Sequence, residues 1–280
     1  MDSLVFAAVL LAAAAHAGWN AAIKRGLDPL VTTVLIAVGA GAVSLPILGL
    51  TGLPAAASRP WVIASVLVHL GYFAGLIEAY RAGDMSQVYP IARGAAPLMT
   101  ALVSTTWLGE RLGLIGWLGL LCLVAGVMML SLRGGATLAL DRRAVGFALF
   151  TALTVCAYSV IDGIGVRASG NALAYTAAVF LGNGAIMALY GLARRGPKLF
   201  AAPSQIWRTG LAGGALQFGS YAVALWAMTV APIAVVAALR ETSVLFGALI
   251  AVVVLREPLR AVRVLAALLI VAGLVMMKSS

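Results

Sequence analysis

The chain has 280 residues, of which 63% are hydrophobic and only 10% are charged. A soluble domain carries about 25% charged residues and could not cover so apolar a surface. A membrane-spanning helix needs about 20 apolar residues, so ten such helices leave about 80 residues for loops and tails. The composition therefore predicts an all-α integral membrane protein with ten transmembrane helices. It excludes a soluble catalytic domain and a cofactor-binding module.

The formal net charge of +10 does not indicate a nucleic-acid partner. The basic residues lie singly or in pairs between apolar runs, a pattern that sets membrane topology rather than binding nucleic acid. Cys122 and Cys156 lie inside apolar runs, so we interpret them as packing residues. We expect no disulfide framework, no metal site and no cofactor.

The first apolar run ends in Ala15–Ala17, which resembles a signal-peptidase site. No Lys or Arg precedes this run, and polar residues follow it before the first basic pair, Lys24–Arg25. We therefore interpret the segment as a retained first helix rather than a cleaved leader.

Short polar segments between the apolar runs divide the chain into ten predicted helices, with bounds accurate to several residues. Lys24–Arg25 and Asp28–Pro29 end the first, and Arg194–Lys198 follows the seventh. The predicted helices cover about residues 3–23, 30–52, 60–81, 86–108, 112–132, 144–165, 172–193, 207–229, 232–255 and 260–278.

An internal repeat supports this division of the chain. A shift of 147 residues places Arg93 on Arg240, and a Glu that follows an apolar helix recurs at matching places in both halves. The sequence therefore predicts two five-helix repeats, residues 1–135 and 136–280. Because five is odd, the second repeat enters the membrane from the opposite side, which predicts inverted repeats around a central cavity.

The loop charges predict an orientation in the membrane. Apart from Arg93 and Arg240, the chain has 17 Lys and Arg, of which 13 lie in odd-numbered loops and 4 in even-numbered loops or tails. Taken alone, this bias places the odd loops in the cytoplasm and both termini outside.

Polar residues inside the predicted helices are the candidates for function, because a charge at mid-membrane costs several kcal/mol unless it faces a cavity or a partner. Several of them recur three or four positions apart and so share a helix face. The predicted cavity residues are His16, Trp19, Asn20, Tyr72, Glu78, Tyr80, Tyr89, Arg93, Tyr158, Asp162, Gln217, Tyr221, Arg240 and Glu241. The predicted hinge or kink points are Pro90, Pro97 and Pro232.

These residue types favour a ligand with both an apolar or cationic part and an acidic part. Aromatic rings suit the former, and the arginine fork suits a carboxylate or phosphate. A zwitterionic amino acid offers both. The alternative for Arg93 and Arg240 is structural, in which each pairs with a carboxylate and locks helices together. For the tyrosines the alternative is the interfacial aromatic belt. Glu78, Asp162 and Glu241 are candidates for proton coupling.

Sequence signatures of enzymes are missing from the chain. It has no Gly-x-Ser-x-Gly elbow, no His-Glu-x-x-His and no phosphate-binding Gly-Lys-Ser/Thr loop. We therefore expect a protein that is not an enzyme and does not use ATP by itself. Transport would run down a gradient or be coupled to an ion. A passive channel would be favoured by a repeated pore motif, and none is visible.

Three groups of residues resemble the EamA-type branch of the drug/metabolite transporter superfamily. They are His16–Asn20 with Lys24–Arg25, Tyr89–Pro97 with Leu108–Leu112, and Ala238–Ser243 with Leu255–Leu259. The resemblance implies that helices 1, 3, 4, 6, 8 and 9 surround a cavity, with the other four outside. It also implies export of amino acids, aromatic ones among them, or of other metabolites. Family members have both termini in the cytoplasm, which conflicts with the loop charges.

The sequence thus predicts a multi-pass carrier of the bacterial inner membrane that exports amino acids or similar small metabolites by alternating access. We expect it to act as a monomer whose partners are its substrate and the bilayer. Arg93 and Arg240 would hold the substrate carboxylate or set the gate. The residues expected to shape the cavity are Trp19, Tyr72, Tyr158 and Tyr221. The alternatives are a carrier of phosphorylated or phosphonate anions and a non-transporting membrane scaffold.

Overall fold

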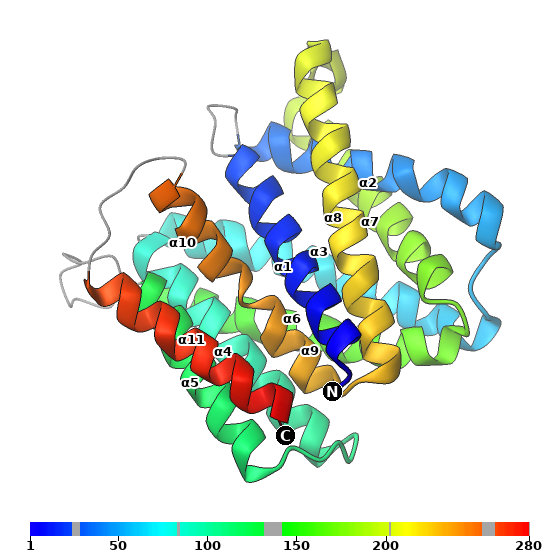
Figure 1. Cartoon of the computed structure of the whole chain (residues 1–280). Coiled ribbons are helices and arrows are strands. Elements are labelled where there is room, and N and C mark those ends of the chain that lie inside the picture. The colour runs from blue at the N-terminus through cyan, green and yellow to red at the C-terminus, as the bar shows by residue number, and fades with distance from the viewer. Residues whose placement is uncertain (24–28, 83–84, 132–141, 202, 254–260, 280) are drawn as a thin grey trace. The chain divides into compact units, whose positions relative to one another are not determined.

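The computed structural model describes residues 1–23, 29–82, 85–131, 142–201, 203–253 and 261–279 (Figure 1). Within these residues all regular structure is helical, without strands. The helices are α1 (Ser3–Ile23), α2 (Pro29–Thr51), α3 (Arg59–Ala82), α4 (Met85–Thr106), α5 (Leu114–Ser131), α6 (Arg142–Ser169), α7 (Ala172–Arg195), α8 (Ser204–Val230), α9 (Ile233–Arg240), α10 (Ser243–Val253) and α11 (Ala261–Ser279), with short 3₁₀ helices η1 (Ala56–Ser58) and η2 (Pro197–Ala201).

Six segments of the described residues are long and apolar enough to cross a membrane, judged by length and composition. They are Leu30–Thr51, Arg142–Ser169, Ala172–Arg195, Ser204–Val230, Ile233–Ile250 and Ala261–Ser279. Two shorter apolar helices are Ser3–Gly18 and Leu114–Leu130. Large apolar side chains such as Leu121 of α5 and Leu268 of α11 are exposed, as expected for helices that face lipid.

The helices group into two compact units, which we call unit 1 and unit 2. Unit 1 comprises residues 1–14, 71–160 and 230–280, and unit 2 comprises residues 15–70 and 161–229. Each unit draws on both halves of the chain, so this grouping differs from the predicted division into repeats of residues 1–135 and 136–280. The two units are described separately below.

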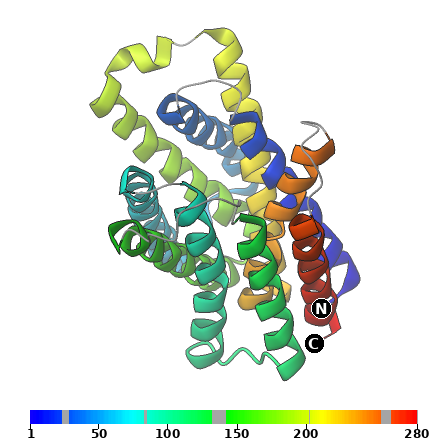
Figure 2. The same ribbon diagram turned by 90° about the vertical axis from the view of Figure 1, so that its left-hand side faces the viewer.

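In unit 1, α5 and α11 run side by side in both views (Figure 1, Figure 2). Glycines let their backbones touch: a Cβ atom on Gly273 would lie 2.6 Å from the carbonyl oxygen of Gly119. The reverse is also true, since a Cβ on Gly119 would lie 2.8 Å from the oxygen of Gly273. Close backbone approach through small residues is how helices associate in lipid, where no hydrophobic force draws them together.

In unit 2, α2 packs against α7 and α8 through a similar set of glycines. A Cβ atom on Gly39 would lie 2.6 Å from the oxygen of Gly210, and one on Gly184 would lie 2.9 Å from the oxygen of Ala37. The high glycine content of the sequence is therefore used, at these positions, for contact between helix backbones.

The predicted ninth helix, residues 232–255, corresponds to one apolar segment, Ile233–Ile250, that a turn at Glu241–Thr242 divides into α9 and α10. Pro232 precedes α9, which ends at Arg240, and α10 begins at Ser243. Between them Thr242 bonds the carbonyl oxygen of Leu239 through both its amide nitrogen (3.1 Å) and its hydroxyl (2.7 Å). The amide of Glu241 likewise bonds the carbonyl oxygen of Ala238, three residues back rather than four, so the turn is tighter than a regular α-helix.

Candidate functional site

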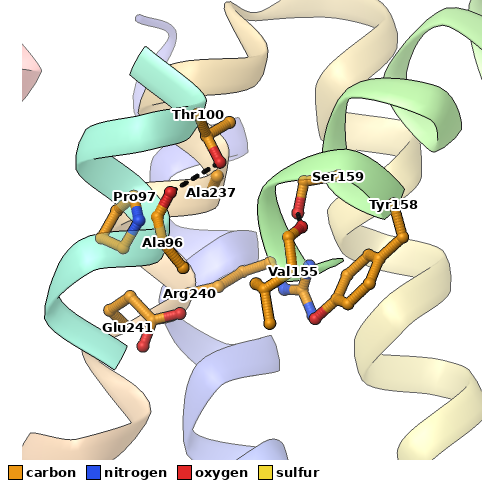
Figure 3. Close-up of a pocket in the computed structure, with 9 residues that line it drawn as sticks. All are labelled: Ala96, Pro97, Thr100, Val155, Tyr158, Ser159, Ala237, Arg240 and Glu241. Carbon is orange, nitrogen blue, oxygen red and sulfur yellow. Dashed lines mark hydrogen bonds between the residues drawn. The ribbon is translucent and has the colours of Figure 1, made fainter. Parts of the chain in front are cut away.

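Unit 1 contains a pocket between α4, α6 and the end of α9 (Figure 3). In this conformation it has room for about one water molecule. Its lining combines small apolar residues, hydroxyl groups, one aromatic ring and charges of both signs. The lining residues are Ala96, Pro97, Thr100, Val155, Tyr158, Ser159, Ala237, Arg240 and Glu241.

The α4 wall of the pocket is shaped by Ala96, Pro97 and Thr100. The hydroxyl of Thr100 donates a 2.8 Å hydrogen bond to the carbonyl oxygen of Ala96, so its polar group is satisfied within the helix (Figure 3). Pro97 lies inside α4 and is buried. Because proline has no amide hydrogen, it cannot bond the carbonyl oxygen of Arg93, four residues earlier, and this weakens the helix at the pocket.

Arg93 of α4 contacts both sides of the interruption between α9 and α10. Its Nε atom lies 2.9 Å from Oε2 of Glu241, and its Nη2 atom donates a 2.8 Å hydrogen bond to the hydroxyl of Ser243. The Arg93 side chain is 20% exposed and that of Glu241 is 7% exposed. This ion pair is therefore largely excluded from water. The geometry corresponds to the alternative in which Arg93 pairs with a carboxylate.

Arg240 enters the pocket from the end of α9, with its guanidinium group pointing toward the Tyr158 side chain of α6 (Figure 3). The Tyr158 ring in turn packs edge-on against Tyr72, with 6.0 Å between ring centroids. Tyr72 packs against Phe73 at 5.3 Å. The pocket thus has an arginine at one side, a carboxylate close to it and a cluster of aromatic rings beyond Tyr158.

Unit 2 contains a second polar cluster, which we call the Asp162 cluster: Asp162, Tyr175 and Tyr221. Asp162 of α6 is fully buried, and its Oδ1 atom accepts a 3.0 Å hydrogen bond from the hydroxyl of Tyr175 in α7. Its Oδ2 atom accepts a hydrogen bond from the hydroxyl of Tyr221 in α8. The Tyr221 ring packs edge-on against Phe180 at 5.6 Å and His69 at 6.4 Å.

The predicted cavity residues and the predicted hinge prolines therefore separate into groups. Those in or beside the unit 1 pocket are Tyr72, Arg93, Pro97, Tyr158, Arg240 and Glu241. Asp162, Gln217 and Tyr221 belong to unit 2, where Oε1 of Gln217 is buried and accepts no hydrogen bond from the described residues. His16 is half-buried in α1, and Pro232 precedes α9. The side chains that lie outside the described part are those of Trp19, Asn20, Glu78, Tyr80, Tyr89 and Pro90.

Tyr175 is a site residue that the sequence did not reveal. It lies in the middle of an apolar run, 13 positions after Asp162 on the following helix, and nothing in the pattern of one chain relates those two positions. Thr100 and Ser159 were missed for a simpler reason. A hydroxyl that bonds its own helix is the ordinary state of Ser and Thr in a membrane span, so neither residue stands out.

Glu110, in the loop after α4, also has a role that was not predicted. Its two carboxylate oxygens accept hydrogen bonds from the first two amides of α9, Oε1 from Ile233 at 3.0 Å and Oε2 from Ala234 at 3.4 Å. Amides at a helix N-terminus have no partner within the helix, and a carboxylate there also suits the helix dipole. The recurrence of a Glu in both halves was the available signal, but it did not indicate this contact.

Comparison with known proteins gives a family and a fold. A model of the EamA-like transporter family matches residues 3–132 and 142–279. The spermidine export protein MdtI of Enterobacter sp. (strain 638) is 33% identical over 75 residues, covering 26% of this chain and 69% of that protein. MdtI of Yersinia pestis (strain Pestoides F) is 35% identical over 77 residues, with the same two coverages.

A protein of known crystal structure shares the fold along nearly the whole chain. The match covers 99% of this chain and 97% of the other, with a TM-score of 0.77. Sequence identity is 20%, so this likeness supports the fold alone.

Proposed function

We propose, since the chain belongs to the EamA-like transporter family, that it exports amino acids or similar small metabolites across the bacterial inner membrane by alternating access. Membership makes the chain a multi-pass membrane transporter of small molecules. The choice of cargo rests on one observation, the presence of Arg240 and Glu241 together in a pocket among apolar helices. A zwitterion carries the two charges that these side chains complement.

In the proposed complex Arg240 binds the carboxylate of the cargo, because its planar fork can hold two oxygens at once. Glu241 binds the ammonium group and exchanges part of its interaction with Arg93 for it. The rings of Tyr158 and Tyr72 would then lie against the cargo side chain. Aromatic surfaces accept both apolar and cationic groups, so this wall fits several amino acids.

The size of the pocket implies that the protein must change conformation to admit cargo. Room for about one water molecule does not hold an amino acid. Two features of the pocket wall support a conformational change: the interruption of the helix at Glu241–Thr242 and Pro97 inside α4. Both reduce the number of regular helical hydrogen bonds, which allows the segments on either side to change their angle.

Two other cargoes are alternatives to an amino acid. The similarity to spermidine export proteins favours a polycation, but it covers 26% of the chain, and an arginine in the pocket repels such a cargo. A phosphorylated or phosphonate anion would use both Arg93 and Arg240. The pairing of Arg93 with Glu241 argues against this, because it leaves one guanidinium group directed into the pocket.

Transport by the purified chain in liposomes separates these cargoes. Labelled amino acids, spermidine and an organophosphate are each offered to the same vesicles, and we expect uptake of amino acids only. Uptake of spermidine or the organophosphate without any amino acid would overturn the proposal. Correctly folded protein that moves none of the three would favour the scaffold alternative.

Variants of the pocket arginine test its assigned role. Arg240→Ala removes a charge-assisted contact worth about 1.5–3 kcal/mol, so we expect about 10- to 150-fold weaker affinity for cargo. Arg240→Lys keeps the charge without the fork and should lose less. Arg208→Ala, at an exposed position in α8, is the matched control and should transport normally. Unchanged transport by Arg240→Ala would contradict the assignment.

A further inference from the structure

Asp162 is a carboxyl group inside a membrane helix, and it is fully buried. Burying a charged group in an apolar region is costly unless it has partners, and such residues in membrane proteins are commonly functional. The proposed export mechanism uses residues of unit 1 and assigns nothing to Asp162. Its surroundings in unit 2 therefore need an explanation of their own.

The partners of Asp162 are two neutral hydroxyl groups, one on each carboxylate oxygen. Among the residues that the structure describes, it forms no ion pair. A fixed cation such as Arg or Lys can only donate hydrogen bonds, so it would suit the ionised carboxylate alone. A tyrosine hydroxyl both donates and accepts. Tyr175 and Tyr221 can therefore satisfy Asp162 in either protonation state, by rotating one O–H bond.

The site is also built to hold a tyrosine close to α6. Gly165 lies one turn after Asp162, and a Cβ atom there would lie 2.6 Å from the ring of Tyr175. Any side chain larger than hydrogen would displace the ring and with it the hydroxyl that bonds Asp162. On the α8 side, Phe180 packs against the Tyr221 ring at 5.6 Å and fixes its position.

The other titratable or charged groups of unit 2 near the Asp162 cluster have partners of their own. His69 of α3 packs edge-on against Tyr221, and its Nδ1 atom lies 2.9 Å from the carbonyl oxygen of Ser65. Arg167, further along α6, is exposed and its Nε atom donates a 2.8 Å hydrogen bond to the carbonyl oxygen of Met228. Neither supplies a positive charge to the carboxylate in this arrangement.

We infer that Asp162, held by Tyr175 and Tyr221, is the proton-binding group through which the carrier is coupled to a proton gradient; this inference rests on the proposed transport function. The step is a simple exchange of one proton. The carboxylate accepts a proton from water on one side of the membrane and becomes a neutral carboxyl. It then donates its new O–H to a tyrosine oxygen, and the proton returns to water on the other side after the conformational change.

A proton fits this site better than a metal cation does. Each carboxylate oxygen already has a tyrosine hydroxyl within hydrogen-bond distance, and the cluster of Asp162, Tyr175 and Tyr221 contains a single carboxylate. A sodium ion would need several oxygen lone pairs directed at one point. The geometry therefore favours gain and loss of a proton.

A direct test needs no knowledge of the cargo. Difference infrared spectroscopy of the purified full chain in liposomes follows protonated carboxyl groups as the pH of the medium is lowered. We expect a carboxyl band that is present in the wild type and absent in Asp162→Asn. Glu110→Gln, which alters a carboxylate outside the cluster, is the matched control and should keep the band. A wild-type band that persists unchanged in Asp162→Asn would overturn the inference.

Transport assays then test coupling separately from transport itself. Exchange of labelled amino acids at equal pH on both sides reports transport without a gradient, and accumulation driven by a pH difference reports coupling. For one proton exchanged, each pH unit supports up to about tenfold accumulation. We expect Asp162→Asn to keep exchange but to accumulate no more with the gradient than without it.

The outcomes distinguish the two proposals. No exchange by the wild type would contradict the proposed cargo, and the infrared result would still decide the role of Asp162. Wild-type exchange with an equal pH response in Asp162→Asn would overturn the coupling role alone, as would accumulation that follows a sodium gradient. If Asp162→Asn fails to fold, Asp162→Glu replaces it. That variant keeps a titratable carboxyl and should retain both the infrared band and coupling.

Discussion

The ion pair between Arg93 and Glu241 gives a quantitative prediction about stability. The two atoms Nε and Oε2 are 2.9 Å apart, and the pair joins α4 to the interruption between α9 and α10. Removing one partner of a buried pair leaves the other charge without compensation, which costs about 3–5 kcal/mol. Removing both partners leaves no such charge and costs much less.

The exposure of the two side chains predicts which single change is worse. Glu241→Gln leaves the Arg93 charge, and the 20% exposure of this side chain lets water reach it. We expect a loss near the lower end of the range, about 3 kcal/mol. Arg93→Met leaves the Glu241 charge, which is only 7% exposed and keeps only the weaker attraction of Arg240, and should cost more, about 4 kcal/mol. The double variant should lose about 3 kcal/mol or less, well below the sum of the two.

Unfolding of the protein in detergent micelles by added SDS, followed by tryptophan fluorescence, measures these free energies. Ser243→Ala is the matched control, because it removes only the neutral hydroxyl that Arg93 also contacts. It should cost about 0.6 kcal/mol, the average for a hydrogen bond between membrane helices. If the double variant loses as much as both single variants together, the two side chains do not interact and the reasoning fails.

Three further changes test other contacts in the same assay. Gly273→Ala places a Cβ against the oxygen of Gly119 and should lower the free energy of unfolding by about 1–3 kcal/mol. Gly146→Ala, with open space around the new Cβ, should leave it unchanged. Equal effects of the two variants would contradict the packing argument. Glu110→Ala removes both acceptors from the start of α9 and should cost about 1 kcal/mol, more than Glu110→Gln, which keeps one. Asn171→Ala removes the acceptor at the start of α7 and should cost about 0.5–2 kcal/mol, with stability restored by Asn171→Asp.

The positions of the helices were predictable because membrane helices are read directly from apolar runs. Each predicted helix is found within a few residues of its expected bounds, apart from the interruption of residues 232–255. At that interruption the hydroxyl of Thr242 bonds its own backbone. Most threonines in membrane spans do so without breaking a helix, so composition does not predict it.

The candidate site was predictable as a set of residue types but not as a set of partners. Charged residues in apolar runs drew attention to Arg93, Asp162 and Glu241, since such residues need a reason to be there. Which of them pair depends on how helices distant in sequence are aligned. The contact of Arg93 with Glu241 and that of Asp162 with Tyr175 therefore emerge only from the structure.

The backbone contact between α5 and α11 affects how genetic data on this protein should be interpreted. Gly119 and Gly273 are not among the residues that line the pocket, yet a Cβ atom at either position would press against the backbone of the other helix. A survey of random substitutions scored by export would show both positions as intolerant, as if they contacted cargo. Measuring how much folded protein reaches the membrane, alongside export, separates such framework positions from Arg240, whose replacement should spare the amount of protein and reduce only the export.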